Sequence, residues 1–229
     1  MVYVLVKHGF LLNGLKNLYY GFMVLAIGLI VVSIIQFIIV AFKIMPPRVY
    51  EAYTDVADIA RRLVAVLMLI YAPAVLVVIV SLYFKYNGFR LLKEYSKAYR
   101  LGFIGSVVAG ISVACMILVI ALTPVAFTAK ETLGVDPLAF LHGIKTAFTI
   151  AFIVLIIGYL LISTSLWRIS RRYRNIYIVV GLIVAAIGLF ITFIITGFGS
   201  LAIALGLKSI HKNITRKVEL PPPPKPSEI

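Results

Sequence analysis

Five long stretches of this sequence contain no Asp, Glu, Lys or Arg, and each holds at least 22 residues. They are residues 17–42, 63–84, 101–129, 146–167 and 175–207. An α-helix rises about 1.5 Å per residue and the hydrocarbon core of a bilayer is roughly 30 Å thick, so about 20 apolar residues cross it once. The sequence therefore predicts an all-α, polytopic transmembrane helical bundle with about five spans.

The composition agrees with a chain whose main solvent is lipid. Of its 229 residues, 62% are hydrophobic and 13% are charged, and the formal net charge is +14. The connections between the stretches are short, so no separate soluble domain fits. Because the bases stand in loops beside the predicted spans, we expect them to contact anionic lipid head groups and not nucleic acid.

We expect three parts along the chain. Residues 1–16 mix apolar and basic side chains and predict an interfacial entry segment, residues 17–210 form the transmembrane domain, and residues 211–229 form a basic and then proline-rich tail. Within the transmembrane domain, spans are expected near 17–42, 63–84, 101–124, 146–167 and 176–196, followed by a re-entrant or interfacial segment at 200–210.

The last uncharged stretch is too long for one crossing, because a straight helix of its length would reach roughly 50 Å. The run TGFGS at 196–200 predicts a break, since glycine favours bends. Whether the segment after this break crosses or re-enters is left open by the sequence.

Two connections, 49–62 and 85–100, have the apolar and charged faces of amphipathic interfacial helices. The second could lie on the lipid surface or pack against its own bundle. A third connection, 168–174, is basic and precedes the last stretch beside aromatic side chains. A phosphate site is one interpretation, but a topogenic loop, which needs no dedicated ligand, is the simpler one. The candidate head-group contacts in these connections are Arg90, Lys93, Lys97, Arg100, Arg168, Arg171, Arg172 and Arg174.

Small residues recur at helical spacing in the predicted spans. Such rows let helix backbones approach closely in lipid, within one bundle or between the subunits of a homo-oligomer. The candidate packing positions are Gly21, Gly28, Gly102, Ser106, Gly110, Gly181, Ala185 and Gly188.

Lys and Arg are concentrated in residues 1–16, 85–100 and 168–174, which share one side if there are five spans. The positive-inside rule then predicts a cytoplasmic N-terminus. The basic residues of the tail would join that side only if the last segment re-enters.

No carboxylate, histidine or basic side chain lies inside the five stretches, which argues against a pump or an ion-coupled transporter. The single cysteine, Cys115, and the three histidines, none of them near the centre of a span, offer no metal or haem site. We therefore expect no catalytic residues, no cofactor and no metal. The polar groups that could line a transport path within the spans are Gln36, Tyr71, Tyr159 and the run 163–165.

These observations favour a noncatalytic scaffold or an accessory subunit of a membrane assembly, with a membrane-protein partner or a second copy of the chain. The alternative is an uncoupled transporter or channel for a small solute, which leaves few traces in sequence. A polar cavity between the spans distinguishes the two, because a scaffold is packed dry.

Three motifs stand in a fixed order, and a proline-rich tail follows them. They contain Gly88, Phe89, Arg90 and Leu91, then Arg168, Arg172 and Tyr173, then Gly206 and Leu207. With them the chain resembles an uncharacterised archaeal family of multi-pass membrane proteins, catalogued as a domain of unknown function (DUF973). The resemblance implies an archaeal origin and a cytoplasmic-membrane location, and it implies no activity and no catalytic residues.

Overall fold

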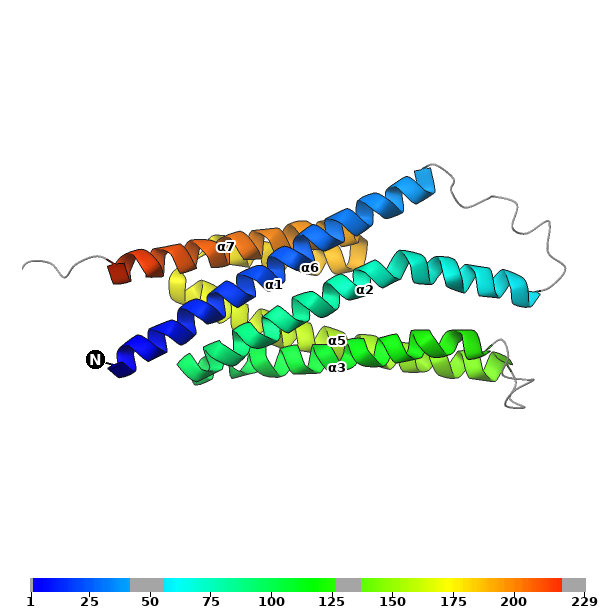
Figure 1. Cartoon of the computed structure of the whole chain (residues 1–229), viewed down its shortest axis with the longest axis horizontal. Coiled ribbons are helices and arrows are strands. Elements are labelled where there is room, and N and C mark those ends of the chain that lie inside the picture. Colours follow the sequence, from blue (N-terminus) through cyan, green and yellow to red (C-terminus); the bar gives the residue numbers. More distant parts are fainter. Residues whose placement is uncertain (1, 42–55, 127–136, 220–229) are drawn as a thin grey trace, which may run out of the picture.

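The computed structural model describes residues 2–41, 56–126 and 137–219 (Figure 1). Six α-helices and one short 3-10 helix make up this part of the chain: α1 (Val2–Ala41), α2 (Val56–Tyr95), η1 (Lys97–Tyr99), α3 (Arg100–Ala126), α5 (Pro137–Tyr173), α6 (Ile176–Ile191) and α7 (Phe193–Glu219). All but α6 of these α-helices contain a segment long and apolar enough to cross a membrane. The predicted all-α bundle with about five spans is confirmed.

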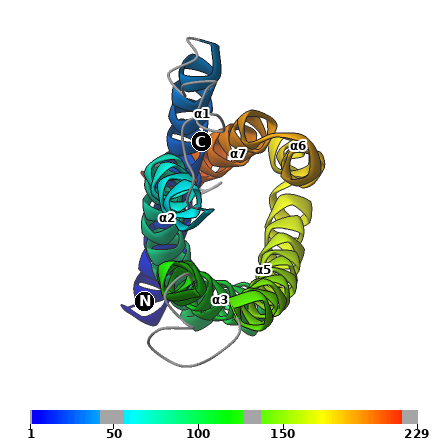
Figure 2. The same cartoon turned by 90° about the vertical axis from the view of Figure 1, so that its right-hand side faces the viewer.

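The helices form a closed ring in which each packs on the next. The contacts run from α1 to α2, α3, α5, α6 and α7, and α7 returns to α1 (Figure 2). Consecutive helices run in opposite directions, so the N-terminus and the C-terminal end of α7 lie at the same end of the molecule (Figure 1).

The predicted interfacial helix at 85–100 is not a separate element. Helix α2 continues through this region to Tyr95, and the chain bends at Ser96, which has an extended backbone. The Ser96 side chain accepts a hydrogen bond from the Ala98 amide and so begins η1. Of the other predicted interfacial helix, residues 49–55 lie outside the described part of the chain, and 56–62 form the start of α2.

The last uncharged stretch folds into a hairpin of α6 and α7. The chain breaks at Thr192, four residues before the predicted position, and Thr192 has an extended backbone. Its hydroxyl accepts a bond from the Ile195 amide at 3.5 Å, as an N-cap of α7. The glycines expected to cause the break lie within α7 and allow close packing instead: a methyl group on Gly197 would lie 2.9 Å from Ile30 Cγ1 of α1.

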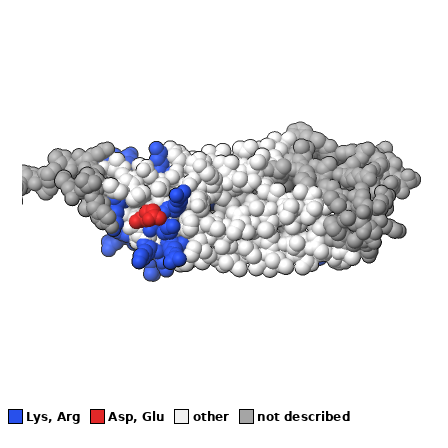
Figure 3. All heavy atoms as spheres, turned by 60° about the horizontal axis from the view of Figure 1, so that its bottom comes forward, with Lys and Arg blue, Asp and Glu red and all other residues white. Residues whose placement is uncertain are grey.

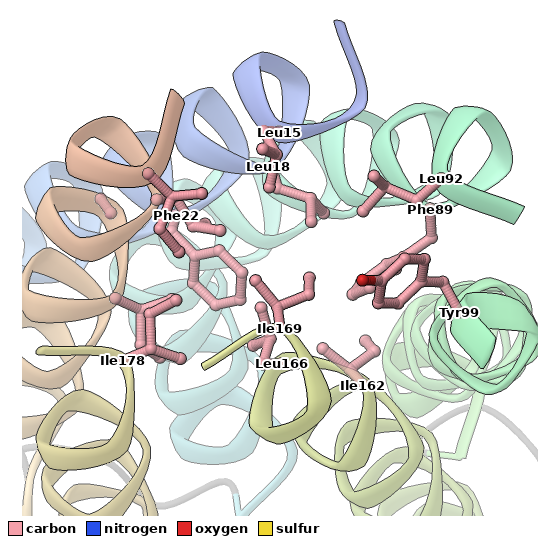
Figure 4. Packing of buried hydrophobic residues seen from close by; sticks show 14 of the residues in the cluster. Leu15, Leu18, Phe22, Phe89, Leu92, Tyr99, Ile162, Leu166, Ile169 and Ile178 are labelled. Carbon is pink, nitrogen blue, oxygen red and sulfur yellow. The ribbon is translucent and has the colours of Figure 1, made fainter. Parts of the chain in front are cut away.

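The main hydrophobic cluster occupies the end of the ring that holds the N-terminus (Figure 4). Its side chains come from all the α-helices except α3, with Tyr99 of η1 added, and they point toward one another across the ring. The largest fully buried ones are Tyr99, Phe89, Leu15, Leu18, Leu92, Ile162, Leu166, Ile169, Ile178, Ile203 and Leu207. The larger of the two buried apolar clusters in the described part of the chain therefore lies where the basic connections join the helices.

Candidate functional site

A lysine is buried in the interior of the ring. Lys85 of α2 has 0% of its surface exposed, and it lies in the segment Pro73–Tyr95 that is apolar enough to span a membrane. None of the five uncharged stretches contains a charged side chain, but the apolar segment of α2 extends beyond the second stretch and includes Lys85. Lys85 directly follows the second uncharged stretch, so the sequence assigned it to the predicted interfacial helix at 85–100, whereas α2 continues unbroken for ten more residues.

The Lys85 ammonium group is surrounded by aromatic rings. Its Nζ lies 4.2 Å from the centroid of the Phe22 ring on α1 and 5.1 Å from that of the Tyr159 ring on α5. It has no hydrogen-bond partner among the described residues. Cation–π attraction offsets part of the cost of burying this charge. Lys85 thus connects three helices at one point.

Gly21 makes room for the stem of Lys85. A methyl group on Gly21 would lie 3.0 Å from the Ser81 carbonyl oxygen and 3.1 Å from Lys85 Cγ. Helix α1 can therefore approach α2 here, and this approach brings the neighbouring Phe22 ring under the ammonium group. Sequence reasoning selected Gly21 as a packing position, but its link to a buried lysine is a property of the tertiary structure.

No described carboxylate neutralises Lys85. Among the Asp and Glu residues, the structure describes the side chain of Glu94 alone. Glu94 pairs with Lys93 at 3.6 Å near the end of α2. One helical turn before Lys85, the Ser81 hydroxyl is also buried and without a hydrogen-bond partner in the described structure. The Lys85 amine and the Ser81 hydroxyl can both donate hydrogen bonds to an anion or a polar solute.

The polar residues expected to line a transport path do not all face the interior of the ring. Tyr159 faces Lys85, and the Ser165 hydroxyl is buried with no hydrogen-bond partner in the described part of the chain. Thr164 is exposed and donates to the Leu160 carbonyl, and Gln36 is half-buried toward the other end of α1. The side chain of Tyr71 lies outside the described set.

The basic segments 85–100 and 168–174 meet at one end of the ring. Figure 3 shows Lys and Arg gathered there, with a long uncharged surface beside them. Arg168 donates to the Ala98 carbonyl at 2.9 Å, and Arg172 donates to the Tyr95 hydroxyl at 3.0 Å. These bonds tie the end of α5 to the bend between α2 and η1, so two connections that are far apart in sequence form one basic surface.

The candidate head-group residues have different surroundings within this surface. Lys93 lies 4.4 Å from the centroid of the Phe103 ring, and Arg171 lies 5.7 Å from that of Trp167. Arg174 and Arg172 both border a pocket at this end of the ring, between the ends of α5 and α7. The remaining three, Arg90, Lys97 and Arg100, are exposed. The structure thus separates a general basic surface from a smaller group at the pocket.

The sequence match covers nearly all of this structure. Residues 12–229 match the model of a family described as "Protein of unknown function (DUF973)". The chain belongs to this family. No curated protein and no solved structure matches it. The resemblance seen in the motifs is confirmed, and for this DUF973 protein the site has to be argued from its own residues.

Most of the small residues selected in this DUF973 protein lie at helix contacts. Gly21 and Gly28 face α2, Gly102 faces Phe89, and Gly181 and Gly188 face α7. Ala185 lies against Gly199 of α7, and Ser106 is buried with its hydroxyl bonded to the Gly102 carbonyl at 2.8 Å. Gly110 has no atom within 4 Å of the position of an added Cβ.

A close approach of α3 to α5 involves two glycines that were not among the predicted packing positions. A methyl group on Gly105 would lie 2.6 Å from the Gly158 carbonyl oxygen, and one on Gly158 would lie 2.8 Å from the Ala109 amide nitrogen. The Ser112 hydroxyl also donates to the Ala151 carbonyl. A search for small residues on two different helices, and not only for repeats within one, is the signal that could have found this contact.

Proposed function

We propose that this protein is a noncatalytic scaffold or an accessory subunit of a membrane assembly, in the cytoplasmic membrane of an archaeon. The observation that supports this role is the apolar cluster across the basic end of the ring. Leu15, Phe22, Ile162, Leu166 and Ile178 approach one another from opposite walls (Figure 4). A solute crossing this level would have to displace them.

The proposed orientation places the basic end in the cytoplasm. The positive-inside rule relates short basic connections to the cytoplasmic side. Both the N-terminal end of α1 and the C-terminal end of α7 lie at this end, because α6 and α7 form a hairpin (Figure 1). The bases of α7, including Lys208, Lys212 and Arg216, then join the basic connections and contact anionic head groups.

A surface on α3 fits the contact with a membrane-protein partner or a second copy of the chain. Gly110 faces open space, and Ala114, one turn later, is exposed. Their large neighbours Ile111 and Leu118 are 59% and 61% exposed. Small residues beside large ones allow close approach of a further helix within lipid.

Affinity purification of the tagged protein from native membranes in mild detergent, with mass spectrometry of the bound proteins, tests the proposal. We expect a stoichiometric partner or a homo-oligomer, and its loss in Gly110→Leu. The matched control is Gly143→Leu on α5, another glycine with open space around it. Recovery of the wild-type protein as a lone monomer would contradict the scaffold role.

Uncoupled permeation of a small solute is the second candidate function, and Lys85 favours it. An unpaired cation in the bundle interior can attract a small anion, and ionisable groups at this depth are functional candidates. Chloride flux into proteoliposomes, followed with a halide-sensitive dye, tests this role. If it holds, flux is lost in Lys85→Met and kept in Lys97→Met, an exposed control on η1. Wild-type flux no higher than that of empty liposomes would exclude it for chloride.

A further inference from the structure

An open pocket of about 820 Å³ lies at the basic end of the ring. Its walls come from the start of α1, the ends of α2 and α5, the connection into α6, and the last turns of α7. The lining residues are His8, Leu11, Tyr95, Arg172, Tyr173, Arg174, Asn175, Ile210, Asn213, Ile214 and Arg216. The volume is within the range of small-ligand sites.

The lining combines positive charge with an apolar part. Three arginines, Arg172, Arg174 and Arg216, belong to the lining together with His8. No Asp or Glu belongs to the described lining. Guanidinium groups match the oxygens of a phosphate in pairs, and such charge-assisted bonds are strong. The charge and shape of the pocket therefore suit an anionic group better than a neutral one.

Arg172 is already oriented by the protein. Its guanidinium carbon lies 5.3 Å from the centroid of the Tyr95 ring and 5.9 Å from that of Tyr173, and it donates to the Tyr95 hydroxyl. A planar donor that already contacts two rings and makes a hydrogen bond loses little freedom when it binds an anion. These contacts leave further N–H groups of the guanidinium for a ligand.

Arg174 has a strained backbone at the pocket. Its φ is 50°, in the left-handed region that favours glycine, directly after the end of α5. The turn is held by the Asn175 amide, which donates to the Ser170 carbonyl at 3.0 Å, and by the Ser170 hydroxyl, which donates to the Asn175 carbonyl at 2.7 Å. Glycine would fit this position without strain. An arginine stands there instead, at a position that borders the pocket.

The turn also begins α6 at the pocket. Asn175 is the residue before the first turn of α6, and its side chain makes no capping bond there. It donates instead to the Gly206 carbonyl of α7 at 3.2 Å. The start of a helix carries partial positive charge, which adds to that of the arginines.

We propose that this pocket binds the phosphate group of an anionic ligand, held by Arg172, Arg174 and Arg216. Leu11, Ile210 and Ile214 supply an apolar wall for the rest of the ligand. The phosphate can belong to a membrane lipid head group or to a soluble phosphate compound. The inference deepens the head-group contact of the proposed function, because it assigns that contact to one pocket instead of the whole basic surface.

The test uses the full-length protein in nanodiscs of phosphatidylcholine, with two probes: phosphatidic acid, followed by native mass spectrometry, and inorganic phosphate, followed by calorimetry. We expect Arg174→Gly and Arg216→Gln each to weaken binding of the bound probe by about tenfold or more. The glycine suits the left-handed backbone, so the first variant keeps the fold. Binding of phosphatidic acid alone identifies a lipid head group, and binding of both probes identifies a site open to soluble phosphates.

Two variants of equal charge serve as controls. Arg171→Gln and Lys212→Gln each remove one exposed cation at the same end of the molecule, outside the pocket lining. We expect them to change affinity less than about twofold, because a general surface field is screened by salt. Equal losses in pocket and control variants overturn the proposal in favour of the whole basic surface. Failure of both probes to bind the wild type overturns it as well, whereas the co-purification of a partner is unaffected by either result.

Discussion

The ammonium nitrogen of Lys85 lies 4.2 Å from the centroid of the Phe22 ring, inside a helical ring and with no described carboxylate beside it. This relationship joins α1 to α2 at the level where α5 supplies Tyr159. It places an amine without a described hydrogen-bond partner between two aromatic rings, one turn from the buried Ser81 hydroxyl, and the energetic cost of burying this amine can be measured.

Replacing Lys85 by methionine is expected to stabilise the fold. Methionine fills a similar space without an amine, and apolar replacement of buried ionic groups is often neutral or gains about 1–4 kcal/mol in the free energy of unfolding. The free energy of unfolding in mixed detergent micelles measures the effect. Lys97→Met, at an exposed position, should change it by less than about 0.5 kcal/mol. A less stable Lys85→Met variant would show that the amine has a partner essential to folding.

The contact of Lys85 with Phe22 should appear as a coupling energy. In a double-mutant cycle of Phe22→Leu and Lys85→Met, the two changes should fail to add by about 0.5–2 kcal/mol, because each removes the same cation–π contact. The same cycle with Lys85→Met and Phe103→Leu is the control, since Phe103 lies over Lys93 instead. Additive effects in the first cycle would mean that the ring merely fills space.

Alanine at Gly105 and alanine at Gly110, both on α3, should change the stability of the protein in opposite directions. Gly105→Ala places a methyl group 2.6 Å from the Gly158 carbonyl oxygen and 2.8 Å from Leu161 Cβ, so α3 and α5 must separate. We expect a loss of about 1–3 kcal/mol in the free energy of unfolding. Gly110→Ala meets nothing within 4 Å and should gain about 0.5–1 kcal/mol through helix propensity. Thermal unfolding in one detergent compares them directly, and equal shifts would contradict the packing of α3 on α5.

Arg174→Gly should stabilise the turn between α5 and α6 while it weakens anion binding. Because glycine adopts the left-handed backbone without strain, Arg174→Gly is expected to raise the free energy of unfolding by about 1 kcal/mol. Arg171→Gly, within α5, should lower the free energy of unfolding by a similar amount. Chemical unfolding of both variants in the absence of added phosphate provides the measurement. Loss of stability in Arg174→Gly would mean that the side chain supports the fold and not a ligand.

Much of the architecture follows from local composition. Uncharged stretches of sufficient length require helices at membrane depth, because a helix satisfies its own backbone hydrogen bonds. This explains why the all-α class, about five spans and the broken last helix could be predicted. The position of the break could not, because the glycines at 197 and 199 have two possible uses. Only the approach of α1 and α6 to α7 shows that they serve packing, while Thr192 ends one helix and begins the next.

The candidate sites depend on contacts that have no local signal. Sequence alone determined that the chain is a helical membrane protein with basic connections, since hydropathy and charge act residue by residue. Tertiary structure decided that Lys85 is buried between Phe22 and Tyr159, and that Arg172, Arg174 and Arg216 border one pocket. The physical reason is that burial and electrostatic surroundings depend on which helices meet, and helices far apart in sequence meet here because small residues let them approach.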